Sequence, residues 1–297
     1  MSGNALGAVL MVASMAGFAL EDMWLKAVAA RLPVGQILVL FGLAGMALCL
    51  TLAAARGERV FTPALRHPAV GWRAVAEVAG RLGYTLAIAL SPLSTASAIL
   101  QATPLVVTLG AALIFGEVVG WRRWLAIAVG FVGVLIVLRP WGAGFNAASG
   151  FALLGMLGFA GRDLATRAAP RGLSNAVLGV LGFAMLVPTG LFLLAIQAGE
   201  WMAPTPGDWA RLAAATAVGV AAYLALTAAM RMGEVGVIAP FRYTRMVFAL
   251  ILGALVFGER PDALMLAGCV LIVGSGLVTL LRARRVSRPV DRRDASA

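Results

Sequence analysis

The sequence predicts an all-α integral membrane protein, with ten transmembrane helices arranged as two inverted five-helix repeats around a central cavity. Composition is the first reason. Of the 297 residues, 61% are hydrophobic and only 12% are charged, about half the charged fraction of an average soluble domain. The second reason is that the apolar residues form ten runs, each near the roughly 20 residues that a helix needs to cross a membrane. The third is an internal repeat.

The repeat is visible at two places in the chain. Residues 17–27 (GFALEDMWLKA) recur as residues 158–168 (GFAGRDLATRA), and 158 minus 17 gives an offset of 141 residues. Residues 113–117 (LIFGE) recur as residues 255–259 (LVFGE), and 259 minus 117 gives an offset of 142 residues. Offsets that agree within one residue indicate one unit written twice. A duplicated unit of about five membrane helices is typical of transporters.

Breaks rich in charge, proline or glycine divide the first half into five expected helices. The first run ends at Arg31, the second at Arg56, and the third at residues 91–94 (SPLS), which are too few for anything but antiparallel neighbours. The fourth run ends at Gly116 and the fifth at Arg139. The expected helices cover residues 4–30, 33–55, 70–91, 94–115 and 121–139.

The second half divides in the same way. Its expected helices cover residues 148–169, 174–198, 209–231, 235–257 and 262–282. We therefore expect a first repeat over residues 1–145, a second over residues 146–283 and a basic tail over residues 284–297. No soluble domain fits between the helices. The chain is also compatible with a homo-oligomer.

Charge distribution gives the expected orientation. If the N-terminus is cytoplasmic, the cytoplasmic segments hold the basic tail and nine arginines, whereas the opposite side holds four arginines diluted by acids. The nine are Arg56, Arg59, Arg66, Arg73, Arg122, Arg123, Arg167, Arg171 and Arg231. This positive-inside bias places both termini of a multi-pass inner-membrane protein in the cytoplasm. Because each repeat has an odd number of spans, the second copy is inverted, which suits alternating access.

The net charge of +11 does not indicate a nucleic-acid partner. Most arginines lie in alternate loops or in the tail, and no basic face with interleaved aromatic residues accompanies them. The expected partners are a small-molecule substrate and the lipid bilayer.

Each repeat ends in a Phe-Gly-Glu element, residues 115–117 and 257–259, followed by a glycine-rich final helix. These features resemble the EamA-type transporters of the drug/metabolite transporter superfamily, over nearly the whole chain. The resemblance implies a cavity lined mainly by helices 1, 3, 4, 6, 8 and 9, with helices 5 and 10 at the periphery. Family members export amino acids and other metabolites, and the chain is most similar to aromatic-amino-acid exporters of the YddG type. We expect Glu117 and Glu259 to act as caps or loop anchors.

Charged residues within the expected spans are the first functional candidates, because a charge in the bilayer core costs at least about 2.5–3.5 kcal/mol. Three acid–base pairs are spaced four residues apart, so they either neutralise each other on one helix face or act in coupling and gating. The pairs are Asp22 with Lys26, Glu77 with Arg81, and Asp163 with Arg167. Both readings remain open.

Glu21 and Arg162 occupy matched positions in the two repeats, an acid in one and a base in the other. This combination suits a zwitterion, whose carboxylate binds arginine and whose ammonium binds glutamate. Inverted repeats place the two residues at opposite depths, however, so they need not contact one molecule together. Glu21 or Asp22 would also couple protons if burial favoured its protonated form. Facilitated diffusion without protons is equally compatible with the sequence.

Arg242 and Arg245 are the strongest candidates for a substrate carboxylate. They lie roughly 10–15 Å into the expected helix 235–257 at 1.5 Å per residue, and no acid lies within a turn of them. They therefore need a carboxylate from another helix, a backbone carbonyl or an anionic group of the substrate. The alternative is a salt bridge to Glu77 or Asp163.

Aromatic and helix-breaking residues complete the expected site. All three tyrosines fall inside expected spans, and with Trp24 they form either an aromatic pocket or ordinary helix packing. Prolines in the fourth and ninth helices bend them and free carbonyl groups, as hinges or only as shape-setting residues. The residues are Tyr84, Tyr223 and Tyr243, the prolines Pro104 and Pro240, and Gln101 beside the first of these.

The competing prediction is that the protein is a membrane-embedded enzyme instead of a transporter. With His67 as the single histidine and only two cysteines, a Ser-His protease and a multi-histidine metal site are excluded. We expect no catalytic residue, metal or cofactor, although an aspartyl pair of Asp22 and Asp163 remains formally possible. No nucleotide-binding motif is present, so ATP is not the direct energy source. The alternative substrate is a lipophilic cation or other drug-like metabolite, bound by Glu21 and Asp22.

Overall fold

In the computed structural model of the protein, every element of regular structure in the described ranges is helical. The described ranges are residues 3–116, 120–139, 147–168, 170, 173–196, 200–232 and 239–286. The first half contains α1 (Gly3–Ala29), α2 (Val34–Ala55), η1 (Pro63–Arg66), α3 (Pro68–Leu90), α4 (Leu93–Leu100), α5 (Thr103–Phe115) and α6 (Trp121–Leu138). The second half contains α7 (Ala147–Ala168), α8 (Asn175–Ile196), α9 (Pro206–Met232), η2 (Ala239–Tyr243), α11 (Thr244–Phe257) and α12 (Ala263–Val286).

Two of the expected helices are broken. The expected helix 94–115 is divided into α4 and α5, because Pro104 has no amide hydrogen and its ring crowds the carbonyl one turn earlier. That carbonyl, on Leu100, instead accepts a hydrogen bond from the Thr103 hydroxyl at 2.5 Å. Of the expected helix 235–257, the structure describes residues 239–257, where the 3₁₀ turn η2 is followed by the α-helix α11 from Thr244. Residues 235–238 lie outside the described ranges.

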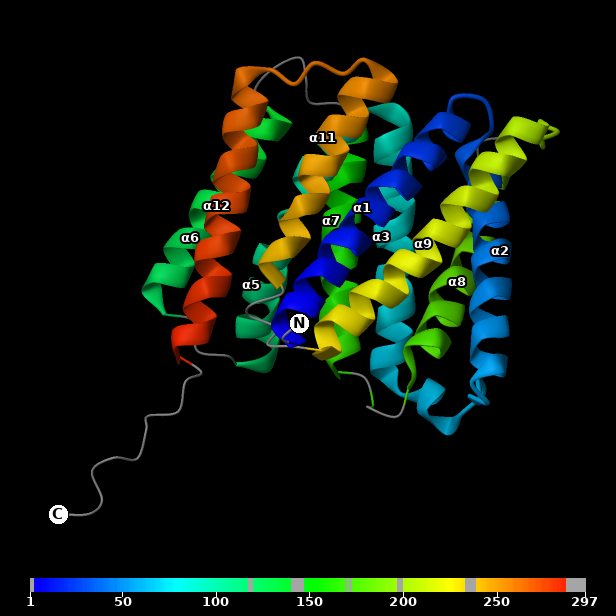
Figure 1. The fold of residues 1–297 in the computed structure, drawn as a ribbon, viewed down its shortest axis with the longest axis horizontal. Helices are drawn as coiled ribbons and strands as arrows, with labels where there is room; N and C mark the ends of the chain where they lie inside the picture. Colours follow the sequence, from blue (N-terminus) through cyan, green and yellow to red (C-terminus); the bar gives the residue numbers. More distant parts are fainter. Residues whose placement is uncertain are drawn as a thin grey trace.

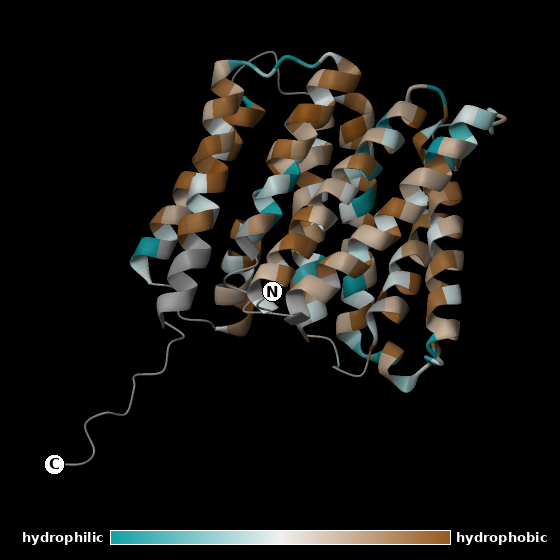
Figure 2. Cartoon of the chain, viewed as in Figure 1, coloured by the Kyte–Doolittle hydropathy of each residue, from teal (hydrophilic) through white to brown (hydrophobic). Residues whose placement is uncertain are grey.

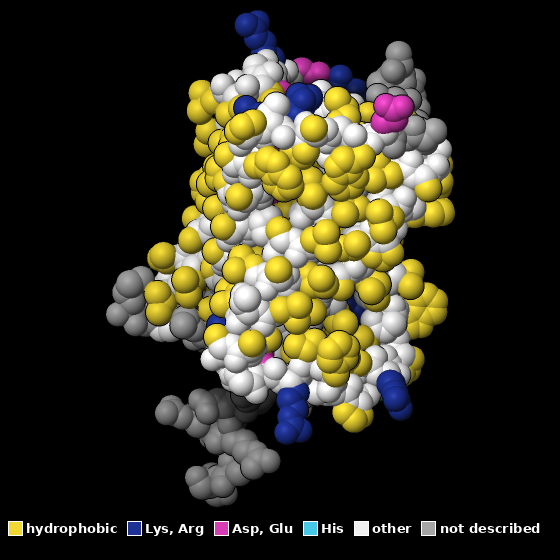
Figure 3. Space-filling view, turned by 90° about the vertical axis from the view of Figure 1, so that its right-hand side faces the viewer, with side chains coloured by type: hydrophobic (Ala, Val, Ile, Leu, Met, Phe, Trp, Pro, Cys, Tyr) yellow, Lys and Arg dark blue, Asp and Glu magenta, His cyan; other side chains and the backbone are white. Residues whose placement is uncertain are grey.

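The described helices are those of a membrane protein. Five are long and apolar enough to cross a bilayer, over Ala5–Ala29, Val34–Ala55, Leu93–Phe115, Ala176–Ile196 and Pro206–Leu226. Apolar residues cover the helices, whereas polar residues gather in the connections and at a few places inside the bundle (Figure 2). On the outer face shown in Figure 3, hydrophobic side chains cover the middle, and basic side chains project at both ends.

Helices from the two halves pack in pairs. α3 lies along α7, α1 along α9, α2 along α8 and α6 along α12, with α6 and α12 at one edge of the molecule (Figure 1). If each helix is replaced by its counterpart in the other half, the α3–α7 pair becomes the α9–α1 pair. The α2–α8 and α6–α12 pairs remain the same. This is the pattern that a two-fold axis between the halves produces.

Glycine allows the paired helices to approach closely. A Cβ atom on Gly158 would lie 2.2 Å from the backbone nitrogen of Gly80, which brings α7 against α3. In the α2–α8 pair, a Cβ atom on Gly190 would lie 2.4 Å from the carbonyl oxygen of Gly35. Small residues at such contacts are how helices pack tightly in membranes. The start of α1 and the end of α12 lie at the same edge of the bundle (Figure 1).

Candidate functional site

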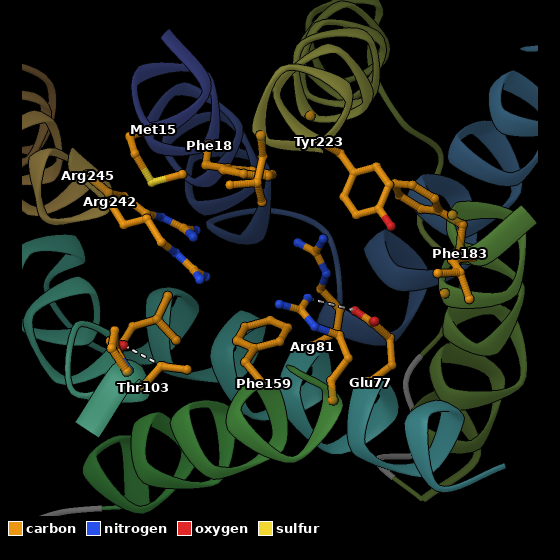
Figure 4. A pocket seen from close by; sticks show the side chains of 18 of the residues that line it. Met15, Phe18, Glu77, Arg81, Thr103, Phe159, Phe183, Tyr223, Arg242 and Arg245 are labelled. Carbon is orange, nitrogen blue, oxygen red and sulfur yellow. Dashed lines mark hydrogen bonds and ion pairs between the residues drawn. The ribbon is translucent and has the colours of Figure 1, made fainter. Parts of the chain in front are cut away.

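A pocket lies in the middle of the bundle, where α1, α3, α7, α8, α9, α11 and the break between α4 and α5 meet. Arginines project into it from several directions, and aromatic rings stand between them (Figure 4). Five arginines and one acid line the pocket in the part of the chain that the structure describes. They are Arg73, Arg81, Arg162, Arg242, Arg245 and Glu77.

The two broken helices bring polar groups to the centre. Gln101 lies at the break between α4 and α5, and Tyr243 closes η2 just before α11. These two residues are repeat mates, since 243 minus 101 gives 142. The side-chain amide of Gln101 donates a hydrogen bond to the carbonyl oxygen of Arg242 at 3.2 Å, which joins the two breaks. Discontinuous membrane helices commonly build transporter binding sites in this way.

Asp22 and Arg245 form a buried ion pair at the site. Arg245 Nη2 donates to Asp22 Oδ2 at 2.7 Å, and the Tyr84 hydroxyl donates to the same oxygen at 3.0 Å. The Tyr84 oxygen also lies 3.0 Å from the Ser97 hydroxyl. The guanidinium of Arg245 lies 5.2 Å from the Phe18 ring centre and 5.4 Å from that of Tyr84. Aromatic rings and a carboxylate thus fix its orientation.

Glu21 pairs with Arg81 behind the pocket. Arg81 Nη1 donates to Glu21 Oε1 at 2.6 Å, and the guanidinium lies 5.3 Å from the Phe41 ring centre. Glu21 is 1% exposed and packs against Gly219 on α9. Its carboxylate is therefore held between α1 and α9, away from the repeat mate Arg162.

Arg162 and Glu77 belong to a second charge cluster on α7 and α3. Arg162 donates to Asp163 Oδ1 from Nε at 3.1 Å and from Nη2 at 2.9 Å, and it lies 3.5 Å from Glu77 Oε1. Arg73 lies 3.5 Å from the other oxygen of Glu77. Arg242 reaches Asp163 Oδ2 at 3.7 Å, so the alternative expected for Arg242, a salt bridge to Asp163, is present.

Two of the three acid–base pairs expected within single helices do not form. Asp22 is bonded to Arg245 instead of Lys26, and Glu77 is paired with Arg73 and Arg162 instead of Arg81. Asp163 is paired with Arg162 and Arg242, and the side chain of Arg167 lies outside the described part. Buried charges need close partners, and packing supplies some of them from other helices, Arg245 for Asp22 and Arg162 for Glu77, whereas Arg73 and Glu77 pair within α3. Asp22 and Asp163 bond to different arginines, which is not the arrangement of an aspartyl pair.

Lys26 and Glu259 meet at the end of the bundle remote from the N-terminus. Glu259 accepts hydrogen bonds from the backbone nitrogens of Leu93 and Ser94, at 2.6 and 3.0 Å, and from the Ser94 hydroxyl at 2.7 Å. The cap role expected for Glu259 is therefore confirmed, whereas Glu117 lies outside the described residues. Lys26 lies 3.8 Å from Glu259 and donates to the carbonyl of Ile88 at 3.0 Å.

The other expected site residues divide into two groups. Gln101, Pro104, Tyr223 and Tyr243 line the pocket. Tyr84 stands behind it with 1% exposure, and Trp24 packs against the main hydrophobic core. Pro240 lies in η2, and its side chain is outside the described set. Within that set, no three His, Cys, Asp or Glu side chains lie close enough to hold a metal ion.

Sequence reasoning missed the aromatic walls of the pocket. Phe18 and Phe159 line it and lie 5.2 Å from Arg245 and 4.8 Å from Arg162, measured from each ring centre to the guanidinium carbon. They are repeat mates, since 159 minus 18 gives 141. Both stand in the repeated Gly-Phe-Ala segment, so the repeat itself carried the signal that could have identified them.

Charge balance gives the site its character. Five pocket arginines meet four carboxylates, Glu21, Asp22, Glu77 and Asp163, which leaves one positive charge in excess in the described part. Arg245 Nε is buried without a hydrogen-bond partner there. Among the described residues, the side chain of Arg242 joins this network only through its 3.7 Å contact with Asp163. The arrangement can therefore bind a carboxylate between Arg242 and Arg245.

Comparison with known proteins agrees with this membrane fold. The sequence model of the EamA-like transporter family matches residues 5–139 and again residues 147–281. The chain belongs to the EamA-like transporter family. It is accordingly a helical membrane transporter of the drug/metabolite transporter superfamily.

Similar curated proteins are transporters of different molecules. An S-adenosylmethionine uptake transporter of Rickettsia bellii is 28% identical over 198 residues, 67% of this chain and 67% of the relative. A riboflavin transporter of Vibrio cholerae is 29% identical over 183 residues, 61% of this chain and 60% of the relative. The pseudopaline exporter CntI of Pseudomonas aeruginosa is 29% identical over 276 residues, 90% of this chain and 93% of the relative.

A crystal structure of another protein has the same fold. It is 21% identical and aligns with a TM-score of 0.60 over 93% of this chain and 99% of that one. At this identity, the likeness concerns the fold alone.

Proposed function

We propose that this transporter exports amino acids with aromatic or other large neutral side chains, and related carboxylate-bearing metabolites, across the inner membrane. The observation that carries the proposal is the pair Arg242 and Arg245. Both guanidinium groups project into the pocket (Figure 4), and their own carboxylate partners leave donors unused. A substrate carboxylate that accepts from both arginines would complete the network.

The rest of the pocket suits a large apolar side chain. Phe18, Phe159, Phe183 and Tyr223 supply ring surfaces, and leucines of α8 and α9 lie beside them. Aromatic surfaces of this kind bind an aromatic ligand through offset or edge-to-face contacts. The YddG-type resemblance favours the same substrate class and the export direction.

A lipophilic cation fits the pocket less well. Five arginines and one acid line it in the described part, so a cation without a carboxylate meets an excess of like charge. The acids expected to bind such a cation lie beside Arg81 and Arg245, Glu21 on the first and Asp22 on the second through one oxygen, and the cation has no carboxylate to offset these arginines. The names of the relatives cover several substrates and both transport directions, so the substrate is inferred from the pocket.

The proposed mechanism is alternating access between two inverted repeats, residues 1–145 and 146–283, with ten spans and both termini cytoplasmic. The pairing of α1 with α9 and of their counterparts α7 and α3 supports the two repeats. Inverted repeats of this kind rock around a central site. The substrate would move down its own gradient or by exchange, without ATP.

Counterflow in proteoliposomes tests the proposal. Vesicles are loaded with unlabelled phenylalanine, and uptake of radiolabelled phenylalanine is followed without any ion gradient. We expect accumulation that competing tryptophan and methionine reduce, and that Arg242→Ala or Arg245→Ala lowers at least about tenfold, the loss of one charged hydrogen bond. Uptake of a lipophilic cation in place of phenylalanine, unaffected by the arginine variants, would show that the proposal is wrong.

A further inference from the structure

The ion pair between Asp22 and Arg245 is only half made. One contact, Nη2 to Oδ2 at 2.7 Å, joins them. The second carboxylate oxygen, Asp22 Oδ1, and the second donor, Arg245 Nε, are both buried and have no hydrogen-bond partner within the described chain. Arginine and carboxylate usually meet through two parallel bonds. Two orphaned groups on the same buried pair therefore need an explanation.

Neighbouring groups in the described part do not complete the pair. From α3, the single proton of the Tyr84 hydroxyl goes to Asp22 Oδ2, and its oxygen meets Ser97 of α4. Arg81, also on α3, is bonded to Glu21. On α1, Lys26 donates to the carbonyl of Ile88 and lies near Glu259, and Glu21 is an acid that offers Asp22 no donor when ionised.

We infer that Asp22 Oδ1 and Arg245 Nε form a zwitterion subsite, in which the α-ammonium of an amino acid binds Asp22 and its α-carboxylate binds Arg245 and Arg242. The inference rests on the proposed function and adds the ammonium partner. An ammonium offers only donors and a carboxylate only acceptors, so each matches one orphaned group. In an α-amino acid a single carbon atom joins the two, which suits an acceptor and a donor on adjoining side chains.

Asp22, instead of Glu21, is the acid of this subsite. Glu21 Oε1 already accepts from Arg81 at 2.6 Å. Its other oxygen lies 2.5 Å from the position that a Cβ atom on Gly219 would occupy, so α9 covers it. Asp22 adjoins Arg245, which lines the pocket, and differs from Glu21 in that its Oδ1 is left without a hydrogen-bond partner in the described chain.

Phe18 stands at the entrance to the subsite. It lines the pocket, lies one helical turn before Asp22 on α1, and covers the Arg245 guanidinium at 5.2 Å. Asp22 is 0% exposed in this structure. Side chains that separate the pocket from Asp22 must therefore move for an ammonium group to reach Asp22 Oδ1, and Phe18, which lines the pocket beside Arg245, is the proposed one.

Binding of two matched ligands to the purified full-length protein tests the subsite. L-phenylalanine has both charged groups, and 3-phenylpropionate lacks only the ammonium. We expect wild type to bind L-phenylalanine at least about tenfold more tightly, the effect of a charged hydrogen bond. Asp22→Asn should reduce that preference to within about twofold. Glu21→Gln removes the competing acid one residue away and should leave the ratio of the two affinities unchanged, even where both affinities fall with the loss of its bond to Arg81.

The outcomes separate the two claims. If wild type binds no L-phenylalanine, the proposed function fails and the subsite fails with it. If wild type binds L-phenylalanine but Asp22→Asn keeps the tenfold preference, or Glu21→Gln abolishes it, only the subsite is overturned. If Asp22→Asn does not fold, a third ligand tested on the wild-type protein decides whether the subsite exists. N,N,N-trimethylphenylalanine keeps the positive charge but has no N–H donors, so it should bind no better than 3-phenylpropionate. Binding as tight as that of L-phenylalanine would overturn the subsite.

Discussion

Three arginines of the pocket share one local design. Arg81, Arg162 and Arg245 each lie over an aromatic ring, at 5.3, 4.8 and 5.4 Å from the centres of Phe41, Phe159 and Tyr84. Each is also bonded to a carboxylate. A ring fixes the plane of the guanidinium and a carboxylate fixes its rotation, so its remaining donors point in a set direction before any ligand arrives.

This design predicts that charge alone cannot replace Arg245. Arg245→Lys keeps the positive charge but removes the flat, stacked fork, so phenylalanine counterflow should fall at least about tenfold. Arg211→Lys is the matched control, because Arg211 is half exposed and meets Asp208 only at 3.8 Å. Full activity of Arg245→Lys would mean that the pocket needs a charge but not an oriented guanidinium.

The sequence indicated one ion pair of the site, Arg242 with Asp163, but not the partners of Asp22 and Glu77. Spacing of four residues suggested Asp22 with Lys26, yet Asp22 bonds to Arg245, 223 positions away. A pair within one helix contributes only about 0.2–0.5 kcal/mol, whereas burial of an unpaired charge costs several times more. The packing of distant helices therefore decides the pairs. The sequence did show which charged residues lie within the expected spans, and therefore which ones lie near the site.

At the scale of elements, helix ends are tied together across the two halves. Glu259, at the end of α11, caps the start of α4, and Lys26, at the end of α1, joins both to the end of α3. The sequence predicted the positions of the long helices well, because runs of apolar residues and their breaks are local. Pro104 and Pro240 indicated bends near Gln101 and Tyr243, but the sequence did not show that the helices break there or that the Gln101 amide joins the two breaks through the carbonyl of Arg242.

The Glu259 cap gives a stability prediction. Glu259→Gln removes the charge that three donors of α4 share, and the free energy of unfolding should fall by about 1–3 kcal/mol. Thermal melting in detergent measures the change. Glu200→Gln is the control, because Glu200 is exposed and surface substitutions usually stay within about 0.5 kcal/mol. Equal melting temperatures for the two variants would show that the Glu259 cap does not stabilise the protein.

Another ion pair between the halves joins Arg139, after α6, to Asp262, before α12. Its contribution to stability should depend on pH. The hydrogen bond from Arg139 lowers the pKa of Asp262, so the stabilisation is present above the unfolded pKa, about 3.9, and is lost as pH falls through the folded pKa. Asp262→Asn should therefore lower the melting temperature at pH 6, and the difference from wild type should shrink towards pH 3. A difference that is constant across this range would exclude the ion pair as its source.

At the scale of the whole molecule, the two halves act as one body with a shared core. The main hydrophobic cluster includes residues of both halves, such as Phe41 and Phe183, whose rings meet edge to face at 5.4 Å. Neither half contains a complete pocket, since Arg81 and Glu77 come from the first and Arg162 and Arg242 from the second. A relative movement of the halves would therefore change the site itself, as alternating access requires.

Inverted repeats predict that repeat mates in equivalent loops face opposite sides of the membrane. Arg59 and Glu200 are such mates, since 200 minus 59 gives 141, and both are exposed. A membrane-impermeant thiol reagent added to intact cells should label Glu200→Cys but label Arg59→Cys only after the membrane is opened. The native Cys49 and Cys269 are each 2% exposed and provide little background. Labelling of both variants from the same side would mean that the repeats are parallel, and the rocking of inverted halves around the arginine pocket would have to be abandoned.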